Sequence, residues 1–172
     1  NIENGVAAMA LAQIAGVSAE DIREGMRTFS GVERRFDIKI NTEKIVLISD
    51  YAHHPNELHA LLETARTMGY QRVILAFQPH TYTRTKALFD DFVRELKRVD
   101  IAVLAEIYAA RESNTIGISS RDLARCIPGS VYFETLPEVT AYLRGAAQKG
   151  DLILTVGAGD IYKAGEALLK EE

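Results

Sequence analysis

The sequence predicts an α/β fold: a doubly wound, mostly parallel sheet of six strands with helices on both faces. Short apolar runs rich in Val, Ile and Leu alternate with longer amphipathic segments, the order typical of strand–helix repeats. The runs are continuously apolar, which indicates strands buried on both faces. With 172 residues, 47% apolar and 26% charged, the chain fits one ordinary domain, or one domain with part of another.

Two helices are predicted before the first strand. Residues 4–15 are rich in Ala and apolar, and a glycine ends that segment. Ser18 is placed to cap a second helix, from residue 19 to about 29, whose acidic first turn suits the helix dipole. The polar connector that follows suggests a domain boundary, so we assign residues 1–36 to the end of one domain and residues 37–172 to the next.

Strands and helices then alternate. Residues 36–40 and 44–49 flank Asn41-Thr42-Glu43, which suits a hairpin turn. Pro55 is tolerated in the first turn of a helix, and Gly69 ends that helix. The other expected strands are 72–77, 101–105, 130–133 and 152–156, and the expected helices are 55–68, 84–98, 119–127, 136–147 and 160–169.

One unbroken helix is expected over residues 84–98 because Leu88, Phe92 and Leu96 repeat every four residues. The only cysteine, Cys126, falls at the end of a short helix, where we expect a small buried apolar residue rather than a nucleophile. A single cysteine also excludes a disulfide framework.

All four histidines lie just after the strands expected at 44–49 and 72–77. In a parallel sheet, loops that leave the carboxyl ends of adjacent strands meet in one crevice, where ligands bind. We therefore expect a site that combines residues of both loops: Asp50, Tyr51, His53, His54, His80 and Arg84.

The first loop offers an acid and several histidines. The Asp50 carboxylate can bind both hydroxyls of a ribose, or it can be a turn or helix-cap aspartate. His53 and His54 can bind phosphate or carboxylate groups or transfer protons. A metal is not expected, because adjacent histidines point in different directions and no carboxylate completes a ligand set. His59 is expected on the surface of the following helix.

The second loop leads into a polar helix start. Exposed amides there favour anions, and Arg84 adds a planar pair of donors for a carboxylate or a phosphate. Thr81 or Thr83 can equally cap the helix with a hydroxyl. Elsewhere, Arg34-Arg35 at the domain boundary is either a pair of solvated charges or a clamp for a phosphate.

The Gly-Ala-Gly segment at 157–159 lacks the third glycine of a dinucleotide fingerprint. We interpret it as a turn where a ligand or a neighbouring domain approaches the backbone closely. The sequence also contains no Gly-x-x-x-x-Gly-Lys-Ser/Thr loop and no Gly-x-Ser-x-Gly elbow, which argues against P-loop binding by this stretch and against an α/β-hydrolase.

Composition excludes several partners. A net charge of −4 offers no basic face for nucleic acid, no apolar stretch approaches the roughly 20 residues of a membrane helix, and no signal peptide is visible. These features suggest a cytoplasmic protein with no nucleic-acid or membrane partner.

Two motifs carry a family resemblance. Asp50-Tyr51-Ala52-His53-His54-Pro55 is followed by Phe77-Gln78-Pro79-His80-Thr81-Tyr82-Thr83-Arg84-Thr85, a combination far more specific than either piece alone. Together they resemble the C-terminal domain of the Mur ligases. Residues 108–112 and 156–161 also match the family pattern. At the front, residues 1–8 resemble the end of the central domain and residues 31–36 the junction before the last domain, so essentially the whole chain is covered.

The resemblance implies a three-domain cytoplasmic enzyme with a Rossmann-like last domain. Such an enzyme joins L-alanine to UDP-N-acetylmuramic acid with ATP and magnesium, through an acyl phosphate. By resemblance, Asp50 and Arg35 hold the ribose and phosphates of ATP, and Asn1 and Asn4 contact its adenine region. Tyr51, His53, His80 and Arg84 face the amino acid and the acyl end of the nucleotide sugar, with His53, His80 and Arg84 as the catalytic candidates.

Two other functions stay open. A recycling ligase that attaches a preformed peptide to the same nucleotide sugar shares much of this domain. A non-catalytic nucleotide-binding or interaction domain can also use this fold.

Many family members carry Arg where this chain has Thr81, which leaves Arg84 as the cation of that loop. ATP and magnesium are expected to bind mainly outside this chain, so the chain alone is expected to be inactive.

Overall fold

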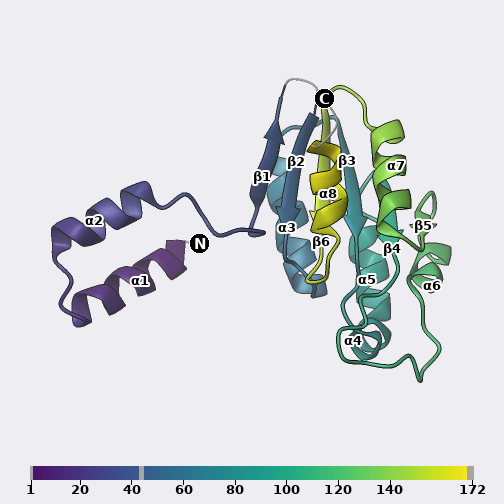
Figure 1. The fold of residues 1–172 in the computed structure, drawn as a ribbon, viewed down its shortest axis with the longest axis horizontal. Coiled ribbons are helices and arrows are strands. Elements are labelled where there is room, and N and C mark those ends of the chain that lie inside the picture. Colours follow the sequence, from purple (N-terminus) through teal and green to yellow (C-terminus); the bar gives the residue numbers. More distant parts are fainter. Residues whose placement is uncertain (1, 43–44, 170–172) are drawn as a thin grey trace. The chain divides into compact units, whose positions relative to one another are not determined.

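The computed structural model describes residues 2–42 and 45–169 (Figure 1). The chain divides into two compact units, Asn1–Val32 and Glu33–Glu172. The division falls between Val32 and Glu33, whereas the sequence placed the boundary near Phe36. Two residues of the expected hairpin segment, 43 and 44, lie outside the described residues.

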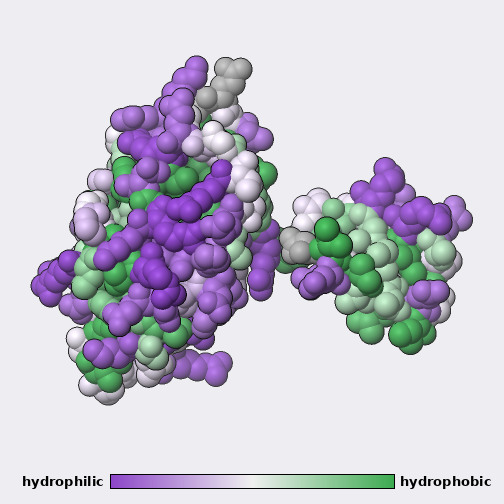
Figure 2. Space-filling model, turned by 180° about the vertical axis from the view of Figure 1, so that it is seen from behind, coloured by the Kyte–Doolittle hydropathy of each residue, from purple (hydrophilic) through white to green (hydrophobic). Residues whose placement is uncertain are grey.

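The first unit is a pair of helices, α1 (Ile2–Ile14) and α2 (Ala19–Thr28), as predicted. The Ser18 hydroxyl caps α2 by accepting the Asp21 amide at 3.1 Å. No residue within either helix is buried. Hydrophobic residues cover much of the face of this unit that Figure 2 shows, and Ile2, Leu11 and Ile14 are largely exposed.

The second unit is built on a six-stranded sheet with the order β1-β2-β6-β3-β4-β5. β1 and β2 form the predicted antiparallel hairpin, and every other pairing is parallel. The predicted fold class is therefore confirmed. The strands are β1 (Asp37–Asn41), β2 (Ile45–Asp50), β3 (Arg72–Phe77), β4 (Ile101–Ala105), β5 (Val131–Phe133) and β6 (Asp151–Val156).

Helices cover both faces of the sheet (Figure 1). On one face, α3 (Pro55–Thr67), α5 (Phe89–Leu96) and α6 (Ser120–Arg125) bury a core that includes Ile48 and Phe77. On the other, α7 (Leu136–Ala146) and α8 (Tyr162–Leu169) cover a second core that includes Leu47 and Ala76. Neighbouring strand residues thus enter opposite cores, as the continuous apolar runs predicted.

The helix expected over residues 84–98 is two helices, α4 (Tyr82–Ala87) and α5, separated at Leu88. Leu88 has φ −114° and ψ 23°, outside the helical range. The four-residue repeat was misleading because Leu88 packs against the same core that buries Phe92 and Leu96 on both sides of the break. A second expectation was also wrong: Cys126, at the end of α6, is exposed.

β6 lies between the two strands that carry the histidine loops. The sequence suggested that β2 and β3 are adjacent, but both pair with β6, so that Asp50 and Phe77 each lie beside Val156. The loops after β2 and β3 lead to helices on one face, and the loop after β6 leads to α8 on the other (Figure 1). Loops that part to opposite faces open a crevice at the carboxyl edge of the sheet.

The Gln78 side chain joins the loop after β3 to the loop after β6. Its Oε1 accepts the amides of Asp160 and Ile161 at 2.9 and 3.1 Å, and its Nε2 donates to Asp160 Oδ1 at 3.0 Å. The Gly-Ala-Gly turn is approached closely, but by Gln78 and Tyr108 of the same compact unit and not by the ligand or neighbouring domain that the sequence suggested. A Cβ on Gly159 would collide with Gln78 Oε1 and lie 2.7 Å from Tyr108 Cγ.

At the amino end of the sheet, a buried carboxylate ties β3 to β6. Arg72 donates from Nε and Nη2 to the two oxygens of Asp151 at 3.0 and 2.7 Å, and the Gln148 amide donates to Asp151 at 2.7 Å. Burial opposes ionisation, but these hydrogen bonds outweigh it and hold the pKa of Asp151 below its ordinary value.

We expect Gly159→Ala to destabilise the domain by about 1–3 kcal/mol, because the added methyl group forces the β6 loop away from Gln78 and Tyr108. The matched control is Gly145→Ala in α7, where nothing lies within 4 Å of the added Cβ; it should be neutral or stabilise by up to about 1 kcal/mol. Urea unfolding measures both. Equal stability of the two variants would contradict the close approach.

We expect Asp151→Asn to lower the thermal midpoint at pH 7 by roughly 5 °C, because a neutral amide pairs poorly with Arg72. The lowered pKa of Asp151 stabilises the fold above the unfolded-state pKa of about 4, and this stabilisation is lost as pH falls through the folded-state pKa. The gap between variant and wild type should thus narrow below pH 4. Asp91→Asn, at an exposed pair with Arg94, is the control with near-wild-type stability. A constant gap at all pH values would refute the linkage.

Candidate functional site

Four loops meet at the carboxyl edge of the sheet, those that follow β2, β6, β3 and β4. Ring contacts cross this edge in a row: Tyr51 to His53 (centroids 5.5 Å apart), His53 to His80 (5.9 Å) and His80 to Tyr108 (5.7 Å, stacked). The structure therefore brings together side chains of both predicted loops, although their strands are not neighbours. We call Tyr51, His53, His80 and Tyr108 the aromatic row.

Asp50 ends β2 beside this row. Its Oδ2 accepts the Phe36 amide at 2.7 Å and its Oδ1 accepts the Ala52 amide at 2.8 Å. The carboxylate thus has the turn role that the sequence allowed, and it also holds the connector before β1. A carboxylate has about four acceptor positions, so each oxygen of Asp50 can still accept a further hydrogen bond.

His53 is oriented by two oxygen atoms. Its Nδ1 lies 3.0 Å from the Tyr51 carbonyl oxygen and 3.4 Å from Glu57 Oε2. Both neighbours accept hydrogen bonds, so Nδ1 carries a proton, and Nε2 is an acceptor when the ring has no second proton. Burial opposes ionisation of Glu57, but the amides and positive charge around it, chiefly those of His53, hold its pKa below the ordinary value.

His54 has a structural role instead. Its Nδ1 accepts the Asn56 amide at 3.3 Å, and Glu57 Oε2 returns the contact by accepting the His54 amide at 3.1 Å. This is a capping box at the start of α3, with Pro55 in the first turn. The phosphate or proton-transfer role that the sequence allowed for His54 is therefore less favoured than that of His53. His59 is exposed, as expected, and lies 3.1 Å from Glu95.

His80 and Arg84 come together one helical turn apart. Arg84 Nη1 lies 3.4 Å from His80 Nδ1. Since a guanidinium can only donate, Nδ1 of His80 is the acceptor and its Nε2 carries the proton. Burial lowers the pKa of His80, and the nearby positive charges of Arg84 and His53 lower it further. His80 is therefore neutral at physiological pH and presents an N–H donor.

The loop after β4 holds the start of α4. Glu112 accepts the Thr83 amide at 2.9 Å and also bonds the Thr83 hydroxyl, and these contacts lower its pKa. Thr81 makes no capping bond with its side chain and has a φ of 66°, rare for a residue other than glycine. The hydroxyl caps proposed for Thr81 and Thr83 are therefore wrong, because Glu112 supplies the cap from another loop.

The two arginines of the boundary differ. Arg34 Nη2 donates to the carbonyl oxygens of Gly157 and Gly159 at 2.6 and 2.8 Å, so its side chain is bound to the loop after β6. Arg35 is exposed, with its guanidinium 5.8 Å from the Tyr51 ring centre. From the sequence, both arginines were expected to have the same role, either as solvated charges or as a clamp for a phosphate. Asn4 is exposed on α1 in the other compact unit, and Asn1 lies outside the described residues.

Three residues that shape the site were not assigned a role from the sequence: Gln78, Tyr108 and Glu112. Gln78 is nearly buried, directly after a buried strand, and a polar residue in that position indicates a required hydrogen-bond partner. No comparable signal marks Glu112, because its partner Thr83 lies 29 residues away in the sequence.

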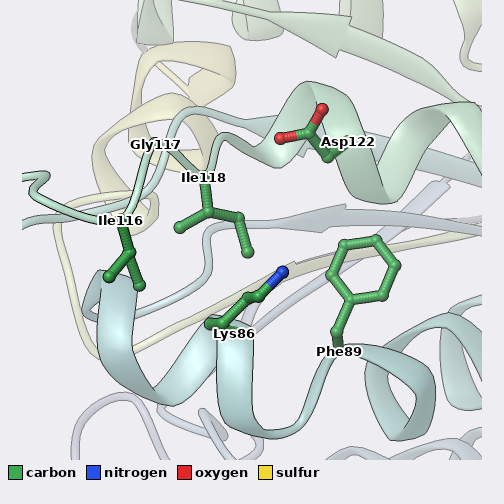
Figure 3. Close-up of a pocket in the computed structure, with 6 residues that line it drawn as sticks. All are labelled: Lys86, Phe89, Ile116, Gly117, Ile118 and Asp122. Atoms are coloured by element: carbon green, nitrogen blue, oxygen red, sulfur yellow. The ribbon is translucent and has the colours of Figure 1, made fainter.

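A hollow of about 180 Å³ lies beside α4 and contains none of the predicted site residues (Figure 3). Lys86 and Phe89 line it from one side, facing residues 116–118 and Asp122. Asp122 already accepts the Ser119 amide at 3.0 Å and an Arg125 nitrogen at 3.1 Å. We therefore place the functional site at the aromatic row, where groups from several loops converge.

Among residues 2–42 and 45–169, no group of three or more His, Cys, Asp or Glu side chains is arranged to hold a metal ion. In the same part of the chain, no helix combines the length and the apolar character needed to span a bilayer.

Comparison with known proteins gives consistent matches. The model of the family "Mur ligase, glutamate ligase domain" matches residues 34–159. The UDP-N-acetylmuramate–L-alanine ligase of Lachnospira eligens is 45% identical over 174 residues, 99% of this chain and 38% of that protein. The solved structure of UDP-N-acetylmuramate–alanine ligase from Thermotoga maritima has a TM-score of 0.77 at 26% identity, over 99% of this chain and 37% of that one.

A murein peptide ligase from Psychrobacter arcticus shares the fold, with a TM-score of 0.69 at 19% identity over 98% of this chain and 36% of that chain. This chain spans 36–38% of the length of the relatives named above. The family match covers most of the second compact unit and all of the aromatic row. The chain therefore belongs to the Mur ligase family.

Proposed function

We propose that this chain is the C-terminal part of an ATP-dependent ligase that joins L-alanine to UDP-N-acetylmuramic acid in the cytoplasm. Residues 1–36 would end its central domain, and residues 37–172 would form the last domain. The observation that carries the proposal is the aromatic row with Arg84 beside His80 and with Asp50 directly before Tyr51. This arrangement offers cations, N–H donors and a carboxylate along one edge, as a nucleotide and an amino acid require.

ATP would meet Asp50 and Arg35. The free acceptor positions of Asp50 suit the hydroxyls of a ribose, and the exposed Arg35 guanidinium suits phosphate oxygens. Asn1 and Asn4 remain the candidates for the adenine region. Magnesium would neutralise phosphate charge during the reaction. Because the described residues contain no ligand cluster for a metal, we place its ligands outside this chain.

L-Alanine would bind at Arg84 through its carboxylate. The guanidinium supplies two donors in the geometry that a carboxylate accepts. His80, neutral and with its proton on Nε2, would add a donor to the acyl phosphate or to the carboxylate without repelling the incoming ammonium group. Tyr51 would line the acyl end of the nucleotide sugar.

His53 is suited to proton transfer. The muramic carboxylate takes the terminal phosphoryl group of ATP, which gives an acyl phosphate and ADP. The alanine amine must lose a proton to attack the acyl carbon, whereupon the amide forms and inorganic phosphate leaves. Nε2 of His53 is the free acceptor in the aromatic row, and Glu57 stabilises the imidazolium that results.

Two alternatives make different predictions. A recycling ligase would take a preformed peptide in place of L-alanine at the same edge. A non-catalytic domain would bind nucleotide or a protein without turnover. The higher sequence identity to named alanine ligases favours the first proposal, since the peptide ligase is similar in fold alone.

The deciding assay uses the full-length protein with ATP, magnesium and UDP-N-acetylmuramic acid. We expect ADP release that depends on L-alanine and is absent with an L-alanyl tripeptide as acceptor. Release with the tripeptide only would identify a recycling ligase. If neither L-alanine nor the tripeptide causes ADP release, the ligase proposal is rejected and the non-catalytic function is favoured. The 172-residue chain alone is expected to be inactive in the same assay.

In the full-length enzyme, Arg84→Ala should lower kcat/KM for L-alanine by roughly ten- to a hundredfold, mainly by raising KM. The change removes charged hydrogen bonds to the alanine carboxylate and leaves Asp50 and Arg35 in place, so KM for ATP should change little. Arg125→Ala, at an exposed arginine on α6, is the matched control. Steady-state kinetics with each substrate varied in turn will test this. An unchanged KM for L-alanine would show that Arg84 does not hold its carboxylate.

A further inference from the structure

The Arg34 side chain is held on several sides by other loops. Its guanidinium carbon lies 4.8 Å from the Tyr51 ring centre and 4.5 Å from the Tyr162 ring centre, so the group is sandwiched between two aromatic faces. Its Nη2 donates to two carbonyl oxygens of the loop after β6, those of Gly157 and Gly159. Its Nε is buried and has no hydrogen-bond partner within the described part of the chain.

These contacts leave Arg34 poorly placed to bind an anion itself. One terminal nitrogen already serves two carbonyl oxygens, Nε is enclosed, and both faces of the guanidinium are covered by rings. An anion would reach only the remaining edge. The side chain is therefore an anchor within the protein.

The backbone around Arg34 has an uncommon conformation. Arg34 and Phe36 have φ values of 58° and 51°, in the left-handed region that residues with a Cβ seldom adopt. Two amides stabilise it: Arg34 N–H donates to Asp37 Oδ2 at 3.1 Å, and Phe36 N–H donates to Asp50 Oδ2 at 2.7 Å. Both residues that flank Arg35 are thus fixed to the domain.

Arg35, between these anchors, is the residue left available. Its side chain is exposed, and its guanidinium carbon lies 5.8 Å from the centre of the same Tyr51 ring that covers Arg34. Its charge contributes to lowering the pKa of Glu57, but among the described residues it lies within ion-pair distance of no acidic side chain. The anchored neighbours set the direction in which the Arg35 side chain leaves the backbone, and the amide of the next residue, Phe36, binds the Asp50 carboxylate.

We propose that Arg34 is a positioning residue for the nucleotide site: it does not touch ATP, but it holds residues 34–36 so that Arg35 meets the phosphates while Asp50 meets the ribose. This inference rests on the proposed function, because it assumes a nucleoside triphosphate at this edge. It assigns to Arg34 a role that depends on Arg35, and that dependence can be measured.

The test is a double-mutant cycle in the full-length protein, with the Kd for ATP measured by calorimetry and KM for ATP and for L-alanine measured by kinetics. We expect Arg35→Ala to weaken ATP roughly tenfold. Arg34→Met should weaken ATP by a similar factor while KM for L-alanine changes less than about twofold. The double variant should bind ATP no more weakly than Arg35→Ala alone, because Arg34 acts through Arg35.

A second pair of variants tests the sandwich without altering an arginine. Tyr162→Phe keeps the ring and should bind ATP as the wild type does, whereas Tyr162→Leu should resemble Arg34→Met. Arg34→Lys should restore part of the affinity, since it keeps a cation between the rings and donors for the carbonyl oxygens. Thermal midpoints without nucleotide, measured for every variant, separate global unfolding from a local effect.

Several outcomes would overturn the proposal: multiplicative losses in the double variant, an unchanged Kd in both Arg34→Met and Tyr162→Leu, or equal increases in both KM values. Wild-type protein that binds ATP but forms no amide would reject the proposed function, while the Kd cycle would still decide the role of Arg34. Wild-type protein that does not bind ATP would reject both.

Discussion

The position of β6 between β2 and β3 determines how the carboxyl edge of this sheet is built. The two loops that bear the catalytic candidates leave strands separated by a third, and the loop of that third strand must pass between them. Only backbone fits there. Gly157 has a φ of 149°, and a Cβ on it would lie 2.6 Å from the Gln78 carbonyl oxygen. The Gln78 side chain accepts hydrogen bonds from two amides of this loop. The ring centres of His53 and His80, from the two outer loops, are 5.9 Å apart.

The same construction explains why the edge remains available to anions in a protein of net charge −4. The acidic residues at this edge accept backbone amides: Asp50 those of Phe36 and Ala52, Glu57 those of His53 and His54, and Glu112 that of Thr83. Their charge stabilises loops, and within the described residues these carboxylates form no ion pair with Arg35 or Arg84. A carboxylate or phosphate that reaches the edge therefore meets the Arg35 guanidinium and the nitrogens of Arg84 that do not contact His80.

The sequence predicted what depends on local pattern. Apolar runs located all six strands, and cap and stop residues located most helix ends, because these signals act over a few residues. Strand order, the helix break at Leu88 and the cap supplied by Glu112 depend on partners distant in the chain, and no local pattern records them. The loop motifs identified the candidate residues, but not which of His53 and His54 would cap a helix.

The Arg34-Arg35 pair shows why a motif cannot assign roles to its members. Two identical side chains are separated by one peptide bond, yet one is enclosed by rings and carbonyl oxygens and the other is exposed. The left-handed backbone conformation at Arg34 and Phe36 produces this difference. Neither residue is a glycine, so the sequence does not indicate this conformation. The conformation persists because Asp50 and the loop after β6 bind it from both sides. The connector and the edge of the sheet thus stabilise each other, and a change in the glycine loop would also disturb the connector that carries Arg35.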